Sequence, residues 1–199
     1  MTKTERQDAQ ALTHLQAAAT TRQRRPFHVD PNDLRRDRPA PGDKAYHMRI
    51  AGDGQWYHEG APIRRAAMVK LFASVLRRGG DGSFWLVTPA ERGLIEVEDA
   101  PFVAVAVEAT GDGPRGHLRF TTNIGQVVDA GPDHPIRVVG GDGDQPRPYL
   151  RVGPGLDALI ARSVFYELVD RAVPRAGPHG PVLGLWSGGA FFELGAPGL

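Results

Sequence analysis

One stretch of the chain, TTNIGQVVDAGPDHPIRV, concentrates polar side chains of four different chemistries. It contains an amide, a carboxylate, an imidazole and a guanidinium, from Asn123, Asp133, His134 and Arg137. Such a set can recognise a small polar or anionic ligand, because a guanidinium pairs with carboxylates or phosphates while the other groups set orientation. The alternative interpretation is that Asp133 and His134 only stabilise a turn before Pro135.

A second polar stretch, WYHE, occupies residues 56–59. His58 and Glu59 begin like a zinc-protease signature, but that signature needs a second histidine one helical turn later, and Gly60-Ala61-Pro62 follows instead. On a strand, side chains alternate between the two faces, so Trp56 and His58 lie on the face opposite Tyr57 and Glu59. The four side chains therefore cannot converge, and His58 is the group of this stretch that we expect to serve a site.

The residues predicted to bind a ligand combine these stretches with neighbouring arginines and two aromatic walls. They are His58, Arg64, Arg65, Asn123, Asp133, His134 and Arg137, with Trp56 and Trp186 as apolar walls.

The sequence matches several known catalytic and ion-binding motifs only in part. Ser187 in LGLWSGGAFF lacks the preceding glycine of a nucleophile elbow, so Gly188-Gly189 is better explained as a hairpin turn. The glycine-rich stretches GDGPRGH and GGDGDQ lack the Gly-Lys-Ser/Thr ending of a phosphate loop, and Asp142 and Asp144 lack the distal glutamate of a calcium loop. With no cysteine, thiolate zinc sites and disulfides are excluded. We predict no metal and no cofactor.

Composition narrows the class of protein. The 199 residues carry a net charge of +1, which gives no general attraction to nucleic acid or membrane. The chain has no apolar run long enough to span a membrane and no signal peptide at its start, so we expect a cytoplasmic protein. Arginine greatly outnumbers lysine, which is typical of a GC-rich bacterial genome.

Hydrophobic periodicity predicts the elements. Residues 1–45 read as a flexible segment with a short helix at 5–23 and an Arg/Pro-rich connector. YHMRI and QWYHE read as strands, and the apolar spacing of IRRAAMVKLFASVLRR predicts a helix that begins at Pro62 and ends at Gly79-Gly80. Six β-rich segments follow in an antiparallel meander, and a second helix includes LDALIARSVFYELVDRA.

The pattern of strand, turn, helix and strand occurs twice, with Trp56 aligned to Tyr149, Gly60 to Gly153 and Phe72 to Phe165. We therefore predict an α+β fold of two related β-helix-β halves with antiparallel sheets. The expected divisions are 1–45, a first half at 46–130 and a second half at 131–199.

Five stretches taken together resemble a known family. They are DGQWYHEGAPIRR, WLVTPAERGLIEVEDAPF, TTNIGQVVDAGPDHPIRV, PYLRVGPGLDALIARSVFYELV and GLWSGGAFFELG. In this order they are similar to the uncharacterised bacterial family catalogued as domain of unknown function 1285, over residues 46 to 195. The resemblance implies a two-part α+β fold, a C-terminal part similar to pleckstrin-homology-like barrels, a ligand cleft between the parts and a signalling or regulatory role. The connector before Tyr46 departs from the family, as does Gln126, where an acidic residue is expected.

Three functions remain open. The leading hypothesis is a non-enzymatic module that binds a small polar or anionic molecule and signals to a protein partner. The second is a hydrolase with His58/Glu59 or Asp133/His134 as its acid–base groups. The third is a nucleic-acid-binding protein that uses the arginines of residues 22–38 with Arg64, Arg65 and Lys70.

Overall fold

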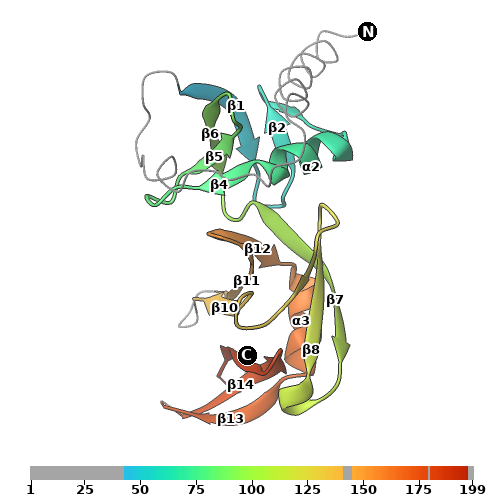
Figure 1. Cartoon of the computed structure of the whole chain (residues 1–199). Coiled ribbons are helices and arrows are strands. Elements are labelled where there is room, and N and C mark those ends of the chain that lie inside the picture. Colours follow the sequence, from blue (N-terminus) through green and yellow to red (C-terminus); the bar gives the residue numbers. More distant parts are fainter. Residues whose placement is uncertain (1–42, 141–144, 179, 197–199) are drawn as a thin grey trace. The chain divides into compact units, whose positions relative to one another are not determined.

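The computed structural model describes residues 43–140, 145–178 and 180–196 (Figure 1). Contacts divide the chain into an N-terminal unit, up to Ile50 and from Trp56 to Val97, and a C-terminal unit, which takes Ala51–Gln55 and the chain from Glu98 onwards. The predicted helix at 5–23 and the connector up to residue 42 lie outside the described residues.

The N-terminal unit is a six-stranded sheet with one helix. Its strand order is β3-β2-β1-β6-β5-β4, and β1 and β6 pair in parallel. The elements are β1 (Lys44–Ile50), β2 (Trp56–His58), β3 (Ala61–Pro62), α2 (Ala66–Ser74), β4 (Leu76–Arg78), β5 (Phe84–Val87) and β6 (Arg92–Val97). Trp56 is fully buried and stacks on Phe72 of α2, with 6.1 Å between ring centroids. This contact joins the helix to the sheet.

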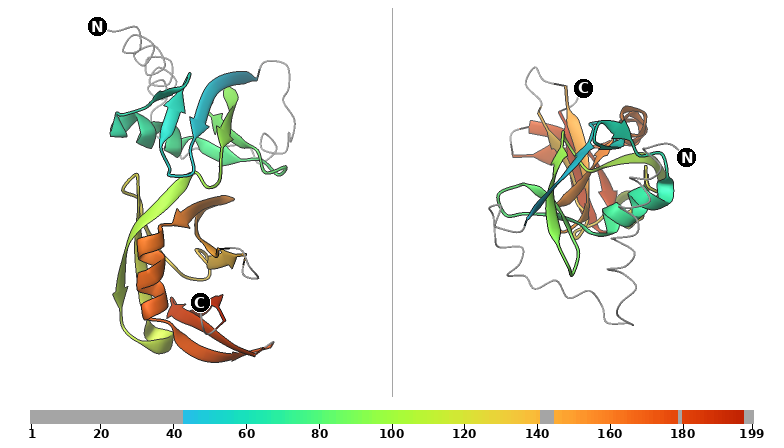
Figure 2. Two further views of the ribbon diagram at one scale, coloured as in Figure 1. Left: turned by 180° about the vertical axis from the view of Figure 1, so that it is seen from behind. Right: turned by 90° about the horizontal axis from the view of Figure 1, so that it is seen from above.

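The C-terminal unit has a second six-stranded sheet, of order β10-β11-β12-β7-β8-β9, with β12 and β7 in parallel. Helix α3 packs on β7, and a three-stranded sheet, β13-β14-β15, follows it (Figure 2). The elements are β7 (Phe102–Thr110), a 3-10 turn η2 (Gly113–Arg115), β8 (His117–Thr122), β9 (Val127–Asp129), β10 (Ile136–Val139), β11 (Arg147–Gly153), β12 (Leu156–Ile160), α3 (Arg162–Asp170), β13 (Val173–Gly177), β14 (Gly180–Ser187) and β15 (Ala190–Gly195).

The two six-stranded sheets have the same strand order. In each, two three-stranded antiparallel meanders join through a parallel pair made by the first and the last strand, β1 with β6 and β7 with β12. The mixed α+β class with two similar parts is therefore confirmed. The expectation of purely antiparallel sheets is wrong at these two central pairs, because periodicity along one strand carries no information about its neighbour's direction.

The domain boundary expected near residue 130 falls inside the second sheet. Strands β7, β8 and β9, which the prediction assigned to the first half, share that sheet with β10, β11 and β12. The chain divides instead between Val97 and Glu98.

Both predicted helices are too long. Pro62 lies in β3, an outermost strand where its missing N–H is tolerated, and α2 ends at Ser74. The residues Leu156–Ile160, expected in the second helix, form β12 between β11 and β7. The repeated feature is thus a hairpin followed by a short helix, and the turn glycine that matches Gly60 is Gly155.

No helix among the described residues is both long and apolar enough to cross a membrane.

Candidate functional site

The predicted ligand-binding residues fall in both units. Trp56, His58, Arg64 and Arg65 belong to the N-terminal unit, and Asn123, Asp133, His134, Arg137 and Trp186 belong to the C-terminal unit.

In the N-terminal unit, Trp56 belongs to the core. Its side chain has no exposed surface, so it cannot serve as a ligand wall in this conformation. His58 is half-buried at the end of β2, where Glu59 and Gly60 turn the chain with φ values of 49° and 80°. Such a turn is typical of a tight hairpin.

Arg64 and Arg65 are exposed ahead of α2, and Arg65 is the N-cap residue of this helix. Both are therefore accessible to solvent.

In the C-terminal unit, Asp133 and His134 occupy the expected turn. Two backbone hydrogen bonds of 3.1 Å join Gly131 and His134. The His134 Nδ1 atom lies 2.9 Å from the Arg151 carbonyl oxygen, which ties the turn to β11, while Asp133 is exposed. These contacts favour a structural role for the histidine.

Asn123 acts as a bridge between backbone segments. Its Oδ1 accepts a hydrogen bond of 3.1 Å from the Val103 N–H, and its Nδ2 donates one of 3.2 Å to the Gly54 carbonyl. The approach to Gly54 is so close that a Cβ there would lie 2.4 Å from the Asn123 Nδ2. The amide is therefore occupied in holding residues 51–55 against the start of β7.

Arg137 belongs to a charged cluster that the sequence did not reveal as a whole. Its Nη2 donates a hydrogen bond of 2.9 Å to one oxygen of Asp157, and the Arg151 Nε donates one of 2.7 Å to the other. Asp157 exposes 7% of its side chain, whereas Arg137 and Arg151 expose 46% and 36%. We call these three residues the arginine pair and its carboxylate.

Aromatic packing extends this cluster. The Arg137 guanidinium lies 4.5 Å from the centroid of the Tyr149 ring, and the Tyr149 hydroxyl donates a hydrogen bond of 2.7 Å to Asp99. Arg147 also donates to Asp99, at 2.7 Å. Burial, followed by the hydrogen bond to Asp99, raises the pKa of the Tyr149 hydroxyl above its usual value.

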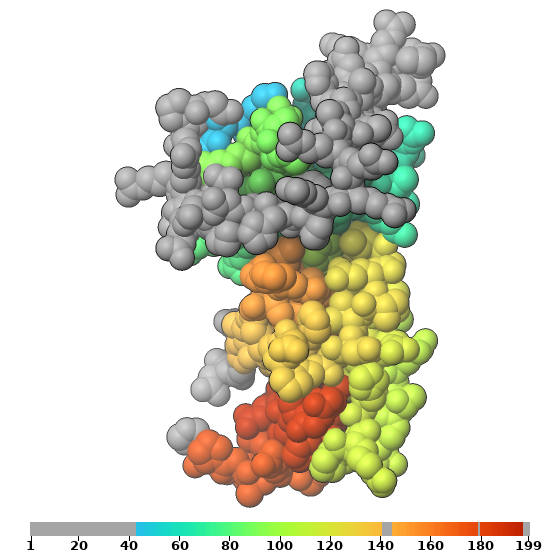
Figure 3. Space-filling model, viewed as in Figure 1, coloured from blue at the N-terminus to red at the C-terminus, as the bar shows by residue number. Residues whose placement is uncertain are grey.

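The register of the β10–β11 and β11–β12 pairs explains how the two arginines, Asp157 and the Tyr149 ring come together. Arg151 lies directly opposite Asp157 in the β11–β12 pair, and Arg137 lies opposite Tyr149 in the β10–β11 pair. The segment that leads into β10, in yellow, is visible on the surface of the C-terminal unit (Figure 3). The predicted ligand-binding residues include neither Arg151 nor Asp157, although a single aspartate within the apolar stretch LDALI was an available signal.

Ser187 has a structural role. It precedes the Gly188-Gly189 turn between β14 and β15, which confirms the predicted hairpin. The fully buried hydroxyl accepts a hydrogen bond of 2.9 Å from the Leu118 N–H and donates one of 2.7 Å to the Ala130 carbonyl. Both hydrogen-bonding functions of the hydroxyl are used in joining β8 and the end of β9 to β14.

We expect the substitution Ser187→Ala to lower the free energy of unfolding by about 1–3 kcal/mol, because it leaves a buried N–H and a buried carbonyl without this partner. Urea denaturation measures the loss. The substitution Ser163→Ala, at an exposed position of α3, is the matched control and should change stability by less than about 0.5 kcal/mol. Equal stabilities of the two variants would contradict this role.

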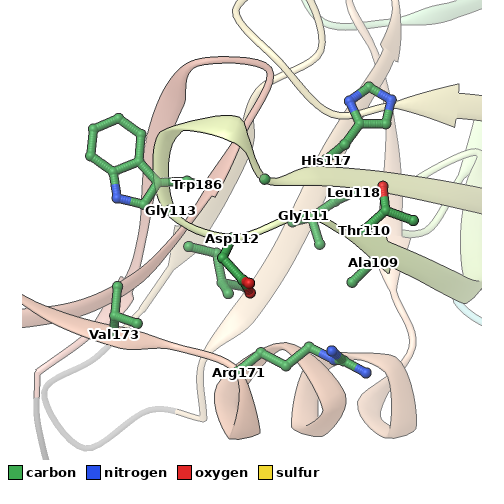
Figure 4. Close-up of a pocket in the computed structure, with 12 residues that line it drawn as sticks. Ala109, Thr110, Gly111, Asp112, Gly113, His117, Leu118, Arg171, Val173 and Trp186 are labelled. Carbon is green, nitrogen blue, oxygen red and sulfur yellow. The ribbon is translucent and has the colours of Figure 1, made fainter.

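Gln126 and Trp186, which the sequence singles out, both have contacts within the C-terminal unit. Gln126 donates a hydrogen bond of 3.4 Å from its Nε2 to the Val152 carbonyl. Trp186 packs edge-on against Phe191 and lines a hollow beside the β7–β8 turn (Figure 4). Within residues 43–140, 145–178 and 180–196, no group of three or more histidines or carboxylates is placed to hold a metal ion.

Comparison with known proteins identifies the family. Residues 38–100 match the model described as "Domain of unknown function (DUF1285), N-terminal domain", and residues 101–194 match "Protein of unknown function (DUF1285), C-terminal domain". The junction of the two models lies close to the division of the structure at Val97 and Glu98. No curated protein matches the chain.

Two solved structures of the same family resemble the chain. A DUF1285 family protein from Silicibacter pomeroyi DSS-3 is 44% identical, with 89% of this chain and 92% of that chain covered and a TM-score of 0.73. A DUF1285 family protein from Shewanella baltica OS155 is 29% identical, with 62% of this chain and 91% of that chain covered and a TM-score of 0.49. The predicted resemblance is thus confirmed, and the chain belongs to the DUF1285 family, with both the N-terminal and the C-terminal domain of that family present.

Proposed function

We propose that this protein is a non-enzymatic regulatory module that binds a small anionic molecule, with Arg137 and Arg151 as the receptor for the anion. The observation that carries the proposal is that two guanidinium groups share one buried carboxylate, that of Asp157. This site lies entirely within the C-terminal unit.

The charges of this cluster do not balance. Neutralising the buried Asp157 needs one positive charge, and a second arginine leaves a surplus of one. The Asp99–Arg147 pair beside it is neutral and does not cancel the surplus. An anionic ligand would restore neutrality at the surface where Arg137 and Arg151 are partly exposed.

The two arginines also have hydrogen-bond donors that Asp157 does not use and that could bind a ligand. A guanidinium carries five N–H donors, and the bonds to Asp157 use one from each arginine. Two guanidinium groups can together offer the parallel donor geometry that carboxylates and phosphates prefer.

The receptor is held in place before a ligand arrives. Asp157 fixes the ends of both arginines, and the Tyr149 ring supports the Arg137 guanidinium. Side chains that are already ordered lose less conformational entropy when the ligand binds, which strengthens binding.

The test uses pyrophosphate as the probe, with titration calorimetry at low ionic strength. We expect the parent protein to bind it, and Arg137→Gln and Arg151→Gln to weaken binding by about tenfold or more. The control is Arg119→Gln, because Arg119 pairs with an exposed aspartate, Asp129, through a bond of 2.7 Å. Binding in the control should equal that of the parent.

Two outcomes would remove the support for this function. One is the absence of pyrophosphate binding by the parent protein, and the other is an equal loss of affinity in all three arginine variants. Circular dichroism of each variant establishes that its fold is intact, and a fall in affinity with added salt is expected for the parent.

The other hypotheses lack such an observation. Asp133 and His134, proposed as acid–base groups of a hydrolase, are held in a turn by backbone contacts. The nucleic-acid hypothesis depends on residues 22–38, which lie outside the described residues. A cytoplasmic location, a protein partner in signalling and the likeness to a pleckstrin-homology-like barrel stay predictions.

A further inference from the structure

The hollow beside the β7–β8 turn is a second place where a ligand could bind, separate in its residues from the arginine pair and its carboxylate. It has a volume of about 280 Å³ and lies within the C-terminal unit. Small-molecule sites usually span about 300–1,000 Å³, so this hollow suits a small metabolite. We call it the turn pocket. It is lined by Ala109, Thr110, Gly111, Asp112, Gly113, Gly116, His117, Leu118, Arg171, Val173, Leu185 and Trp186.

The backbone that forms one wall is closely constrained. Gly111 has a φ of 68°, and a Cβ at this position would lie 2.7 Å from the Arg115 carbonyl oxygen. Gly116 is equally confined, since a Cβ there would lie 2.8 Å from the carbonyl oxygen of Trp186. Its own carbonyl accepts a hydrogen bond of 3.1 Å from the Gly188 N–H, so the turn is fixed against the β14–β15 hairpin.

Opposite charges reach this pocket from two different elements. Asp112 comes from the β7–β8 turn, and Arg171 is the C-cap residue of α3 (Figure 4). Both residues are exposed, and within the described part of the chain neither forms an ion pair. The C-terminus of a helix favours a cation, which accounts for an arginine at this position but not for the aspartate of the turn.

The remaining walls are mainly apolar. Leu118 and Leu185 are buried, Val173 is 45% exposed, and part of Trp186 completes this side. Thr110 adds a neutral hydroxyl group to the lining (Figure 4). A ligand with a short aliphatic group could cover the exposed apolar surface while its charged end meets the polar groups.

We propose that the turn pocket binds a small zwitterion with an aliphatic side chain, of the type of an α-amino acid. The Arg171 guanidinium would receive the carboxylate, and the Asp112 carboxylate would receive the ammonium group. A simple anion would satisfy Arg171 but be repelled by Asp112, and a simple cation would meet the reverse situation. A molecule with both charges matches both residues.

Three probes of nearly the same shape separate these cases. They are L-leucine, 4-methylpentanoate, which lacks the ammonium group, and 3-methylbutylamine, which lacks the carboxylate. Titration of the full chain followed by NMR of the Trp186 indole should show leucine binding about tenfold or more tighter than either analogue. Failure of leucine to bind at about 10 mM, or equal affinities for the three probes, would overturn the proposal.

Charge-removing variants assign the two contacts. In Arg171→Gln the advantage of leucine over 3-methylbutylamine should disappear, and in Asp112→Asn its advantage over 4-methylpentanoate should disappear. Glu108→Gln, on β7 but outside the pocket, is the control and should leave all three affinities unchanged. Leucine binding that is unaffected by both pocket variants would contradict the assignment. The proposal is independent of the anion site, because Arg137→Gln should leave leucine binding intact.

Discussion

Replacing Asp157 with asparagine is expected to lower the free energy of unfolding by about 3 kcal/mol, because a buried carboxylate that holds two arginines is lost. Asparagine has nearly the same shape as aspartate, but its amide nitrogen, Nδ2, is a hydrogen-bond donor. One of the two arginines would therefore meet a donor where it now meets an accepting oxygen. Arg137 and Arg151 would then repel each other without the negative charge between them. Urea denaturation followed by circular dichroism measures the change.

The same variant also tests the anion site. If the arginine pair receives anions, phosphate should restore more stability to Asp157→Asn than it adds to the parent protein, since the anion takes the place of the missing charge. Asp129→Asn is the matched control, because Asp129 is an exposed aspartate that receives a guanidinium. Arg119 holds the pKa of Asp129 below its usual value, but solvent screens this pair, so a much smaller loss is expected. A loss in Asp157→Asn no larger than in this control would contradict the structural role of the buried carboxylate.

Replacing Trp56 with alanine is expected to lower the free energy of unfolding by about 3–5 kcal/mol, the usual loss for a large aromatic side chain removed from a core. The indole is fully buried and stacks on Phe72, so its removal leaves a cavity between α2 and the sheet. Denaturation followed by the fluorescence of Trp85, in the same unit, reports this loss.

Leu94→Ala is the control for this prediction, since Leu94 lies in the same sheet and is 39% exposed. Its effect should be well below that of Trp56→Ala. If the two variants were equally stable, Trp56 would not be the core residue that its burial indicates.

A strand was predictable from the sequence where apolar and polar residues alternate along it, because one face of such a strand is buried and the other is exposed. β8 places its apolar residues, Leu118 and Phe120, on the buried face at every second position. The helix bounds were not predictable in this way, because Val75 and Leu76 continue the helical spacing of Phe72 although the chain has left the helix after Ser74. The Ser74 hydroxyl donates to the Leu71 carbonyl at 2.7 Å, and the Val75 N–H turns to Phe72 instead. A hydroxyl that competes for a helix carbonyl in this way favours the end of a helix.

The candidate site was predictable only in part. Arg137 and the turn at His134 could be found because they are close in sequence, and Arg137 does lie in the charged cluster. Asp157 comes into the cluster through the register of two hairpins, and register depends on turn geometry that the residue types leave open. Trp56 was predicted to be an apolar wall of the site, and its complete burial is visible only in the packed structure.

The parallel pair at the centre of each sheet also sets an order of events during synthesis on the ribosome. Lys44 of β1 pairs with Gly93 of β6, so β1 has no partner on that side until nearly the whole N-terminal unit has been made. At about 5–20 residues per second this interval lasts roughly 3–10 s. In the second sheet, the edge of β7 that pairs with β12 corresponds to the edge of β1 that pairs with β6. β6 ends at Val97, and β7 begins only at Phe102. All six strands of the first sheet are therefore synthesised before β7, which carries the equivalent edge of the second sheet, begins.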